Sequence, residues 1–276
     1  MMIDKIKEAI KNKLLLYKIA KFFIKIFNSI ENYIISFLLF PISPVAVEKF
    51  VIVTGSDSRH YKSLKQLLSS ILLHEIKTKV IVFDLGLLNE EINELKIQFR
   101  NIELRKFDYS KYPEYFNIKI NAGEYAWKPV IISNILEEFK NSVFWMDAGN
   151  VVYSPLITIR KIIKLTGFYS PYSEGKINKW THQSTLKFLK ASNDILYRRN
   201  LSGGCVAINY EFNEVKKTIH KWKDCALTKD CIAPEGSSRK NHRQDQAVLS
   251  VLAYQAKIVN RLFNKFYGFK IHQNIN

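Results

Sequence analysis

The sequence predicts an α/β protein whose mostly parallel sheet is flanked by helices, and three observations support this prediction. Apolar runs of strand length alternate with segments of amphipathic helical spacing along residues 49–146. The length of 276 residues suits one α/β domain with an appendage. Hydrophobic residues make up 47% of the chain, which provides the apolar surface that a sizeable core needs.

The alternation can be followed element by element. Strands are predicted over 49–54, 79–83, 102–107 and 142–146, and helices over 63–74, 89–99 and 125–139. Ligands of parallel sheets bind at the carboxyl ends of the strands. The residues at these ends are therefore the first candidates for a site, namely Thr54, Gly55, Ser56, Asp84 and Asp147.

The net charge narrows the class of partner, and the cysteine content indicates the state of the thiols. The net charge of +17 would suit nucleic acid, an anionic membrane surface or a phosphorylated substrate. The basic residues are spread along the chain and form no known nucleic-acid motif, so the sequence disfavours nucleic acid. Cys205, Cys225 and Cys231 have irregular spacing, which predicts reduced thiols and neither a disulfide framework nor a zinc site.

Residues 1–48 differ in composition from the rest of the chain. Residues 1–30 carry seven lysines against two acidic residues, and apolar side chains recur among them at helical spacing. The segment lacks the cleavage site of a signal peptide, and its apolar run is too short for a transmembrane helix. We expect a basic amphipathic helix lying on an anionic membrane surface. A helical arm packed on the main domain, 49–276, or on a second subunit is the alternative.

Asp147 is the centre of the predicted site. An apolar strand runs directly into this carboxylate, which is followed by Ala148, Gly149 and Asn150. A carboxylate at this place can hold a divalent cation whose other ligands are diphosphate oxygens, and a glycine lets a diphosphate approach the backbone. The alternative is an aspartate that caps a turn after a strand.

Three further segments carry groups suited to the same ligand. Lys128 lies at the start of a helix, with Pro129 in the first turn, where an ammonium group and backbone N–H groups converge on a phosphate. Gly203 and Gly204 precede an apolar strand, and they permit either close backbone approach to a ligand or only a bulge. Asp245 precedes an apolar helix, so it either caps that helix or faces the substrate as an acid/base group.

Taken in this order, the segments resemble the GT-A (Rossmann-like) nucleotide-diphospho-sugar transferases, particularly glycosyltransferase family 8. The motifs that carry the resemblance are Asp147-Ala-Gly149, Ser202-Gly-Gly-Cys-Val-Ala-Ile-Asn209 and Asp245-Gln-Ala-Val-Leu-Ser250. Two others, Asp84-Leu-Gly-Leu87 and Tyr125-Ala-Trp-Lys-Pro129, resemble the proteins of domain of unknown function 1647. The resemblance covers about residues 50–272. It has one clear departure, because Gly149 stands where the family's D-x-D metal motif has its second acid.

The resemblance implies a role for each candidate residue. The donor-binding residues would be Thr54, Gly55, Ser56, Asp84, Lys128, Asp147, Gly149, Gly203, Gly204 and Lys270. Asp245 and Gln246 would be the catalytic pair beside the donor sugar. Asp147 and His272 would hold Mn²⁺ or Mg²⁺.

The activity implied by the resemblance is a glycosyltransferase that moves a sugar from a nucleotide-sugar donor, with a UDP-sugar favoured, to a glycan or lipid-linked acceptor. Retention of stereochemistry is favoured over inversion. The expected setting is bacterial surface polysaccharide synthesis, of lipopolysaccharide or capsule, in the cytoplasm at the inner face of the cytoplasmic membrane. Two alternatives stay open: a transferase of a phosphoryl or nucleotidyl group on the same fold, and a non-catalytic basic adaptor on membranes or nucleic acid.

Overall fold

The computed structural model describes residues 34, 35 and 37–275. The chain divides into two compact units, Met1–Ile42 and Ser43–Asn276. In the first unit, the N–H group of Leu39 donates a helical hydrogen bond of 2.9 Å to the carbonyl oxygen of Ile35. The amphipathic helix predicted for residues 1–30 lies outside the described residues, so its membrane role stays a prediction. None of the helices that the structure describes has the length and apolar character needed to cross a bilayer.

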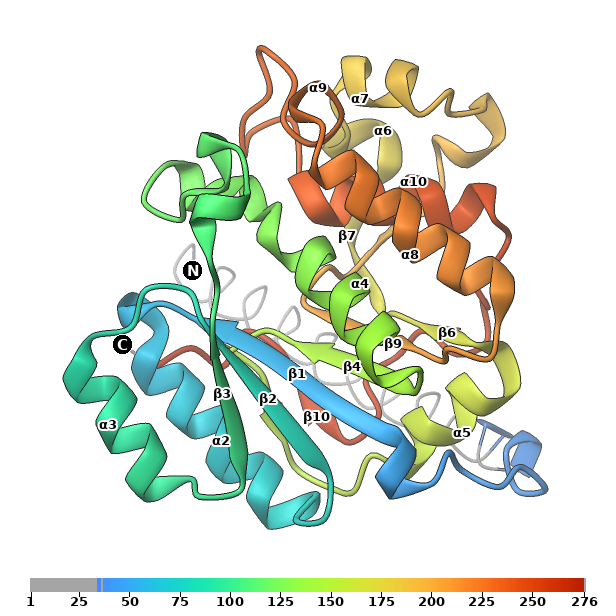
Figure 1. Ribbon diagram of the computed structural model, residues 1–276. Coiled ribbons are helices and arrows are strands. Elements are labelled where there is room, and N and C mark those ends of the chain that lie inside the picture. The colour runs from blue at the N-terminus through green and yellow to red at the C-terminus, as the bar shows by residue number, and fades with distance from the viewer. Residues whose placement is uncertain (1–33, 36, 276) are drawn as a thin grey trace, which may run out of the picture. The chain divides into compact units, whose positions relative to one another are not determined.

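A six-stranded sheet forms the centre of the second unit (Figure 1). Its strand order is β3 (Ile102–Lys106), β2 (Lys79–Asp84), β1 (Phe50–Ser56), β4 (Ser142–Met146), β9 (Cys205–Ile208) and β6 (Phe168–Tyr169). The first four of these strands pair in parallel, whereas β9 is antiparallel to both β4 and β6. The predicted Rossmann-like, mostly parallel sheet is thus confirmed, and the carboxyl ends of β1, β2 and β4 meet at one edge.

Helices cover both faces of this sheet (Figure 1). On one face lie α2 (Tyr61–His74) and α3 (Asn89–Gln98), and on the other lies α4 (Trp127–Phe139). Two later helices, α8 (Asn213–Ala226) and α10 (Gln244–Gln255), pack on each other, and α8 also contacts α4. This arrangement brings the start of α10 to the same edge of the sheet as the end of β4.

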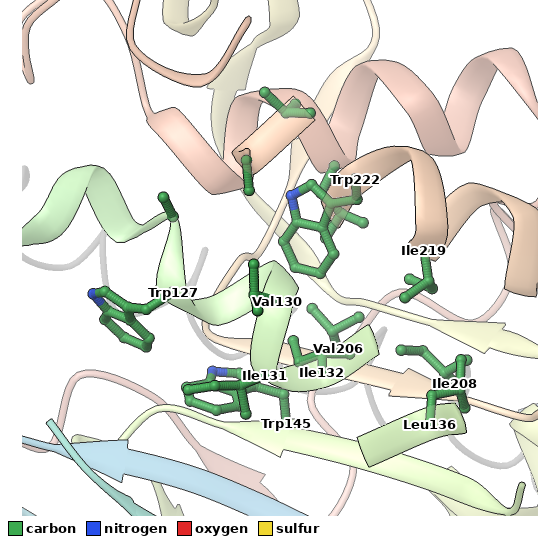
Figure 2. Close-up of a cluster of buried hydrophobic side chains, with 14 of the residues drawn as sticks. Trp127, Val130, Ile131, Ile132, Leu136, Trp145, Val206, Ile208, Ile219 and Trp222 are labelled. Carbon is green, nitrogen blue, oxygen red and sulfur yellow. The ribbon is translucent and has the colours of Figure 1, made fainter. Parts of the chain in front are cut away.

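The core explains why the central strands are apolar on both faces. Successive residues of a strand point to opposite faces. Val51 and Val53 of β1 join the cluster under α4, while Phe50 faces the other side, where its ring lies 6.1 Å from that of Phe144. Figure 2 shows α4 between Trp145 of β4 and Trp222 of α8, whose side chains are fully buried.

The remaining elements are short. Two small antiparallel pairs join β10 (Phe269–Lys270) to β5 (Val151–Val152) and β7 (Tyr172–Lys176) to β8 (Arg199–Leu201). The other α-helices are α5 (Ile157–Thr166), α6 (Ile177–Trp180), α7 (Gln183–Phe188) and α9 (Lys229–Ile232). Short 3₁₀ turns occur at Val47–Lys49, Ser58–His60, Tyr109–Lys111, Glu114–Phe116, Asn121–Tyr125 and Asn193–Ile195.

The helix predicted over 125–139 begins two residues later than expected. Asn121–Tyr125 form a turn in which every residue has a positive φ, between 47° and 62°. A run of five residues with positive φ does not fit α-helical geometry, so the regular turns of α4 begin after this turn ends. Trp127 Nε1 donates a hydrogen bond of 3.0 Å to the carbonyl oxygen of Ala122, which ties the turn to the first residue of the helix.

The prediction of reduced thiols is wrong for two of the three cysteines. Cys225, near the end of α8, and Cys231, in α9, form a disulfide with Cα atoms 5.2 Å apart. The sequence spacing of six residues does not match a known motif, and only the turn between the two helices brings the thiols together. Cys205 in β9 is free and buried, and burial raises the pKa of its thiol.

Candidate active site

A cleft opens at the edge of the sheet where β1 and β4 end. The residues that line it come from stretches of the chain that are far apart in the sequence. They are Gly55, Ser56, Asp57, Arg59, His60, Leu85, Ile118, Ala122, Tyr125, Trp127, Lys128, Asp147, Ala148, Gly149, Asn150, Ser173, Ser202, Gly203, Gly204, Arg239, Asp245, Gln246, Ile271, His272 and Asn274.

Asp147 is fixed in this cleft by the strand that precedes it. Its backbone N–H donates to the carbonyl oxygen of Gly204 at 2.9 Å, which continues the pairing of β4 with β9. Trp145 Nε1 donates a 2.7 Å hydrogen bond to Asp147 Oδ1. The Asp147 side chain is 44% exposed, so the carboxylate is oriented by the protein and still open to a ligand.

Lys128 is buried beneath Asp147, with its side chain only 3% exposed. Its Nζ lies 3.1 Å from Asp147 Oδ1, 2.9 Å from Asp245 Oδ2 and 3.2 Å from the carbonyl oxygen of Gly203. The contact with the Gly203 carbonyl oxygen is a hydrogen bond, and the contacts with the two carboxylates are ion pairs. Burial acts to lower the pKa of Lys128, but the two carboxylates outweigh it and raise the pKa above its usual value, which keeps the ammonium charged.

Asp245 is the second carboxylate on this ammonium. It is the second residue of α10, which Arg243 precedes as the N-cap residue, so Asp245 points to Lys128 and does not cap the helix. Trp222 Nε1 donates to the Asp245 carbonyl oxygen at 2.9 Å and ties this residue to α8. Burial raises the pKa of the Asp245 carboxyl, and the nearby Lys128 partly counters that effect. Lys128, Asp147 and Asp245, of which Lys128 and Asp245 are buried and Asp147 reaches the cleft, are called the buried triad below.

The two glycines form the wall against which the carboxylates rest. A Cβ added to Gly203 would lie 2.9 Å from Asp245 Oδ2, and one added to Gly204 would lie 2.8 Å from Asp147 Oδ2. Both distances are shorter than real Cβ contacts allow. The glycine pair is therefore required by the close approach of the carboxylates, in addition to any approach by a ligand.

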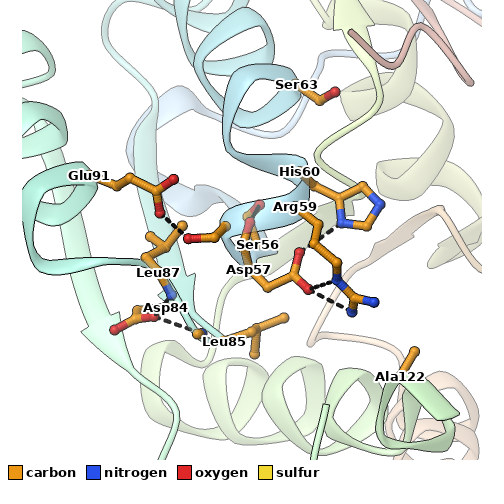
Figure 3. Close-up of polar contacts among 12 residues, drawn as sticks. Ser56, Asp57, Arg59, His60, Ser63, Asp84, Leu85, Leu87, Glu91 and Ala122 are labelled. Carbon is orange, nitrogen blue, oxygen red and sulfur yellow. Dashed lines mark hydrogen bonds and ion pairs between the residues drawn. The ribbon is translucent and has the colours of Figure 1, made fainter. Parts of the chain in front are cut away.

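A second group of charges lies at the end of β1, on the rim of the cleft (Figure 3). Asp57 Oδ2 lies 2.7 Å from Arg59 Nη2, and Asp57 Oδ1 lies 2.8 Å from His60 Nδ1. The hydrogen bond with Asp57 raises the pKa of His60 and outweighs burial, which acts in the opposite direction. Burial would raise the pKa of Asp57, but the hydrogen bonds with His60 and Arg59 lower it overall. Asp57, Arg59 and His60 are called the rim cluster below.

The opposite wall carries an aromatic ring and a further cation. The Arg239 guanidinium lies 5.1 Å from the centre of the Tyr125 ring, at the end of the left-handed turn. Gln244 Nε2 donates to Glu124 Oε2 at 3.1 Å and joins that turn to the start of α10. Gln244 itself has a φ of 33°. Strained backbone of this kind gathers at functional sites, and here it flanks Asp245 directly.

The cleft suits a divalent cation that arrives together with a ligand. Among the described residues, no three His, Cys, Asp or Glu side chains gather as a metal site. Mg²⁺ usually binds one or two carboxylates together with substrate phosphates, and does not need an all-protein cage. Asp147 fits this pattern, since Oδ1 is held by Lys128 and Trp145 while Oδ2 lies beside Gly204. His272 lines the same cleft.

Most residues predicted for the site line this one cleft. They are Gly55, Ser56, Lys128, Asp147, Gly149, Gly203, Gly204, Asp245, Gln246 and His272. Three predicted residues, Thr54, Asp84 and Lys270, do not line the cleft. Thr54 is fully buried in β1, and Lys270 is exposed in β10. The third, Asp84, accepts hydrogen bonds from Gly86 and Leu87 N–H groups at 2.8 and 2.7 Å and so shapes a turn.

Several cleft residues escaped the sequence analysis. Asp57, Arg59 and His60 follow β1 closely, and one acidic and two basic residues directly after a buried strand are a signal that could have identified them. Arg239 and Asn274 stand in polar segments with no comparable signal. Only the folded chain brings them to the cleft.

Comparison with solved structures finds glycosyltransferases at low sequence identity. The WbbM bifunctional glycosyltransferase is 16% identical, with a TM-score of 0.49 over 77% of this chain and 39% of that one. The galactosyltransferase LgtC, solved with donor and acceptor sugar analogs, is 14% identical, with a TM-score of 0.45 over 73% of this chain and 70% of that one. Core-mannan synthase A from Aspergillus fumigatus, in a Mn/GDP form, is 7% identical, with a TM-score of 0.46 over 74% and 69% of the two chains. The chain thus spans well under half the length of WbbM.

Two other comparisons concern sequence. No curated protein matches this chain. A family model described as a protein of unknown function, DUF1647, matches residues 42–133, which is less than half of the chain. This match confirms the resemblance to domain of unknown function 1647 that Asp84-Leu-Gly-Leu87 and Tyr125-Ala-Trp-Lys-Pro129 indicated.

Proposed function

We propose that this chain is a glycosyltransferase of the GT-A type that transfers a sugar from a nucleotide-sugar donor to a hydroxyl group of an acceptor. In this reaction the bond between the anomeric carbon and the diphosphate breaks, and a bond from that carbon to the acceptor oxygen forms. The nucleoside diphosphate leaves, and the proton of the acceptor hydroxyl passes to the leaving diphosphate or to water. The site must therefore bind a diphosphate, hold a sugar beside it and admit a second substrate.

One observation carries this proposal: the buried triad lies at the floor of a cleft whose rim is cationic. Lys128 holds Asp147 and Asp245 within 3.1 Å of one ammonium group, while Arg59, His60 and Arg239 line the same cleft. Cations on the rim attract a diphosphate and stabilise the charge that develops on it as it leaves. Carboxylates behind that rim can accept hydrogen bonds from sugar hydroxyl groups.

The roles of the residues follow from their places in the cleft. We assign Gly55 and Ser56, at the end of β1, to the nucleotide. Asp245 and Gln246 are assigned to the transferred sugar, with Gln246 beside Gly203. Lys128 orients the two carboxylates of the buried triad, since its buried ammonium group is ion-paired with both.

A divalent cation, Mn²⁺ or Mg²⁺, is part of this proposal. Asp147 would hold it, with His272 as a further ligand, and the diphosphate would supply other oxygens. When bound, the cation would neutralise charge on the leaving diphosphate.

The wider setting is proposed on the sequence. A UDP-sugar donor, a glycan or lipid-linked acceptor and reaction with retention are implied by the family-8 resemblance. The net charge of +17 and the lysine-rich residues 1–30 favour an anionic membrane surface, at the inner face of the cytoplasmic membrane. A role in the synthesis of a bacterial surface polysaccharide would account for the donor, the acceptor and the membrane surface together.

The proposal is tested by thermal unfolding in a panel of nucleotide sugars, with and without Mn²⁺. A ligand that binds only the native state raises the midpoint temperature, by an amount that grows with its concentration relative to Kd. We expect at least one nucleotide sugar to stabilise the protein, and Asp147→Asn to remove the part of this shift that depends on Mn²⁺. Mass analysis of products separates sugar transfer from phosphoryl or nucleotidyl transfer.

The matched control is Asp224→Asn, which alters an exposed carboxylate on α8 outside the cleft. It should keep the ligand-dependent shift of the unaltered protein. Absence of a shift with every nucleotide sugar would overturn the proposed function and would favour a non-catalytic adaptor.

A further inference from the structure

Residues 269–275 lie across the turn that follows Asp147. β10 pairs with β5, directly after that turn, through Phe269 with Val152 and Lys270 with Val151. The N–H group of Gln273 then donates a 2.7 Å hydrogen bond to the carbonyl oxygen of Gly149. One position beyond Asn274, the N–H group of Ile275 donates to Ser63 Oγ of α2 at 3.0 Å.

These contacts hold Asn274 from both sides, and its side chain rests on Gly149. A Cβ added to Gly149 would collide with Asn274 Oδ1, and it would lie 2.9 Å from Asn274 Cγ and 3.0 Å from Nδ2. The amide of Asn274 therefore occupies the space that a side chain at position 149 would need. This is also the position at which the D-x-D motif has its second acid.

We propose that Asn274 supplies the second oxygen ligand of a divalent cation bound with the donor diphosphate, in place of the carboxylate that Gly149 lacks. The inference rests on the proposed function, because the cation is expected to arrive with the diphosphate. An amide carbonyl oxygen is a suitable ligand for Mn²⁺ and Mg²⁺, which prefer oxygen. Glycine at position 149 is then a requirement of the site, since any side chain there displaces the amide.

The position of Asn274 relative to the other ligands supports this assignment. Asn274, His272 and Asp147 all line the one cleft. Asp147 Oδ1 is engaged by Lys128 and Trp145, so Asp147 has its second oxygen to offer to a cation. A neutral amide beside this carboxylate adds an oxygen without adding a further negative charge to the buried triad, whose net charge is already negative when both carboxylates are ionised.

The test measures Mn²⁺ binding directly, by the loss of the electron paramagnetic resonance signal of free Mn²⁺ on titration with protein in the presence of UDP. Asn274→Ala should weaken Mn²⁺ binding at least about tenfold. The double variant Asn274→Ala/Gly149→Asp places a carboxylate in the vacated space and should restore the affinity. Gln273→Ala is the matched control, because it removes an exposed side chain that donates to the carbonyl oxygen of Ile271 and not to Asn274, while the backbone hydrogen bond to Gly149 remains.

Each result bears on the inference. Unchanged Mn²⁺ affinity in Asn274→Ala would overturn it, and so would the absence of Mn²⁺ binding to the unaltered protein with UDP. Failure of the double variant to recover affinity would show that the amide does not stand in for a residue at position 149. Thermal stabilisation by a nucleotide sugar in Asn274→Ala keeps the proposed function intact in all of these cases, whereas its absence in the unaltered protein removes both.

Discussion

The buried triad and the rim cluster line the same cleft, and their arrangements of charge are opposite. In the triad, one cation 3% exposed holds two carboxylates in place. In the rim cluster, one carboxylate, 8% exposed, holds two basic side chains, of which Arg59 is 66% and His60 51% exposed. The floor of the cleft thus carries carboxylates that are held in place as hydrogen-bond acceptors. Its rim carries exposed basic side chains that can change their hydrogen-bond partners.

This difference teaches where each charge can act. A buried ion pair is fixed by its surroundings, and removal of one partner leaves an uncompensated charge. An exposed pair is weak and screened by salt, so its side chains can leave one partner for another. We therefore expect the triad to set the geometry of the site, and the rim cluster to bind a diphosphate that comes from solution.

The largest expected effect comes from removing the cation of the buried triad. Lys128→Met leaves Asp147 and Asp245 without their shared partner, and should cost about 3–5 kcal/mol in the free energy of unfolding measured in urea. The double variant Lys128→Met/Asp245→Asn should recover part of this loss, because the buried carboxylate is gone. If the free energy of unfolding fell by less than about 1 kcal/mol in Lys128→Met, the triad would not be more rigid than the rim cluster.

A methyl group at Gly204 tests the same rigidity by crowding. In Gly204→Ala the new Cβ would stand 2.8 Å from Asp147 Oδ2, whose partner oxygen is held by Lys128 and Trp145. We expect a loss of about 1–3 kcal/mol. Gly55→Ala is the comparison variant, since its Cβ would lie 3.1 Å from Leu85 Cδ1 and 3.3 Å from Trp145 Cη2, which are longer contacts with apolar side chains. Equal losses in the two variants would argue that the carboxylate is no more fixed than the leucine.

The smallest expected effect concerns the rim cluster and depends on pH. The pKa of His60 is raised in the folded protein, so its charge stabilises the fold below its unfolded pKa of about 6.5, and this contribution is lost as pH rises through the folded pKa. The lowered pKa of Asp57 keeps that carboxylate charged in this range. His60→Gln should therefore cost less than about 1 kcal/mol near pH 5.5 and nothing near pH 9. A cost that is independent of pH and salt would show that His60 acts by packing and not by charge.

Sequence reasoning succeeded where the signal was local. The apolar run of β4 ends at Met146 and places Asp147 at a strand end, which the folded chain reproduces. The position of Pro129 in the first turn of α4 also agrees. The left-handed turn at Asn121–Tyr125 was missed, because four of its five residues are not glycine and nothing in their pattern predicts positive φ.

The site was harder to predict because its contacts join distant parts of the chain. The ion pair between Lys128 and Asp245 links the starts of α4 and α10, two helices with unrelated sequence patterns. Asp245 fits a helix cap equally well from its sequence, and only its contact with Lys128 decides between the two roles. The disulfide between Cys225 and Cys231 was missed for a similar reason, since it depends on the path of the turn between α8 and α9.

By itself, the sequence determined the main strands and helices of residues 49–146, and that polar groups gather where β1 and β4 end. Periodicity and apolar runs are properties of neighbouring residues, so they can be seen without the fold. The tertiary structure decided that Lys128 is buried between two carboxylates, that Gly203 and Gly204 leave room for them, and that Asn274 rests on Gly149. These contacts depend on which distant segments of the chain lie side by side in the fold. They also depend on how closely a glycine, which has no side chain, lets its neighbours approach.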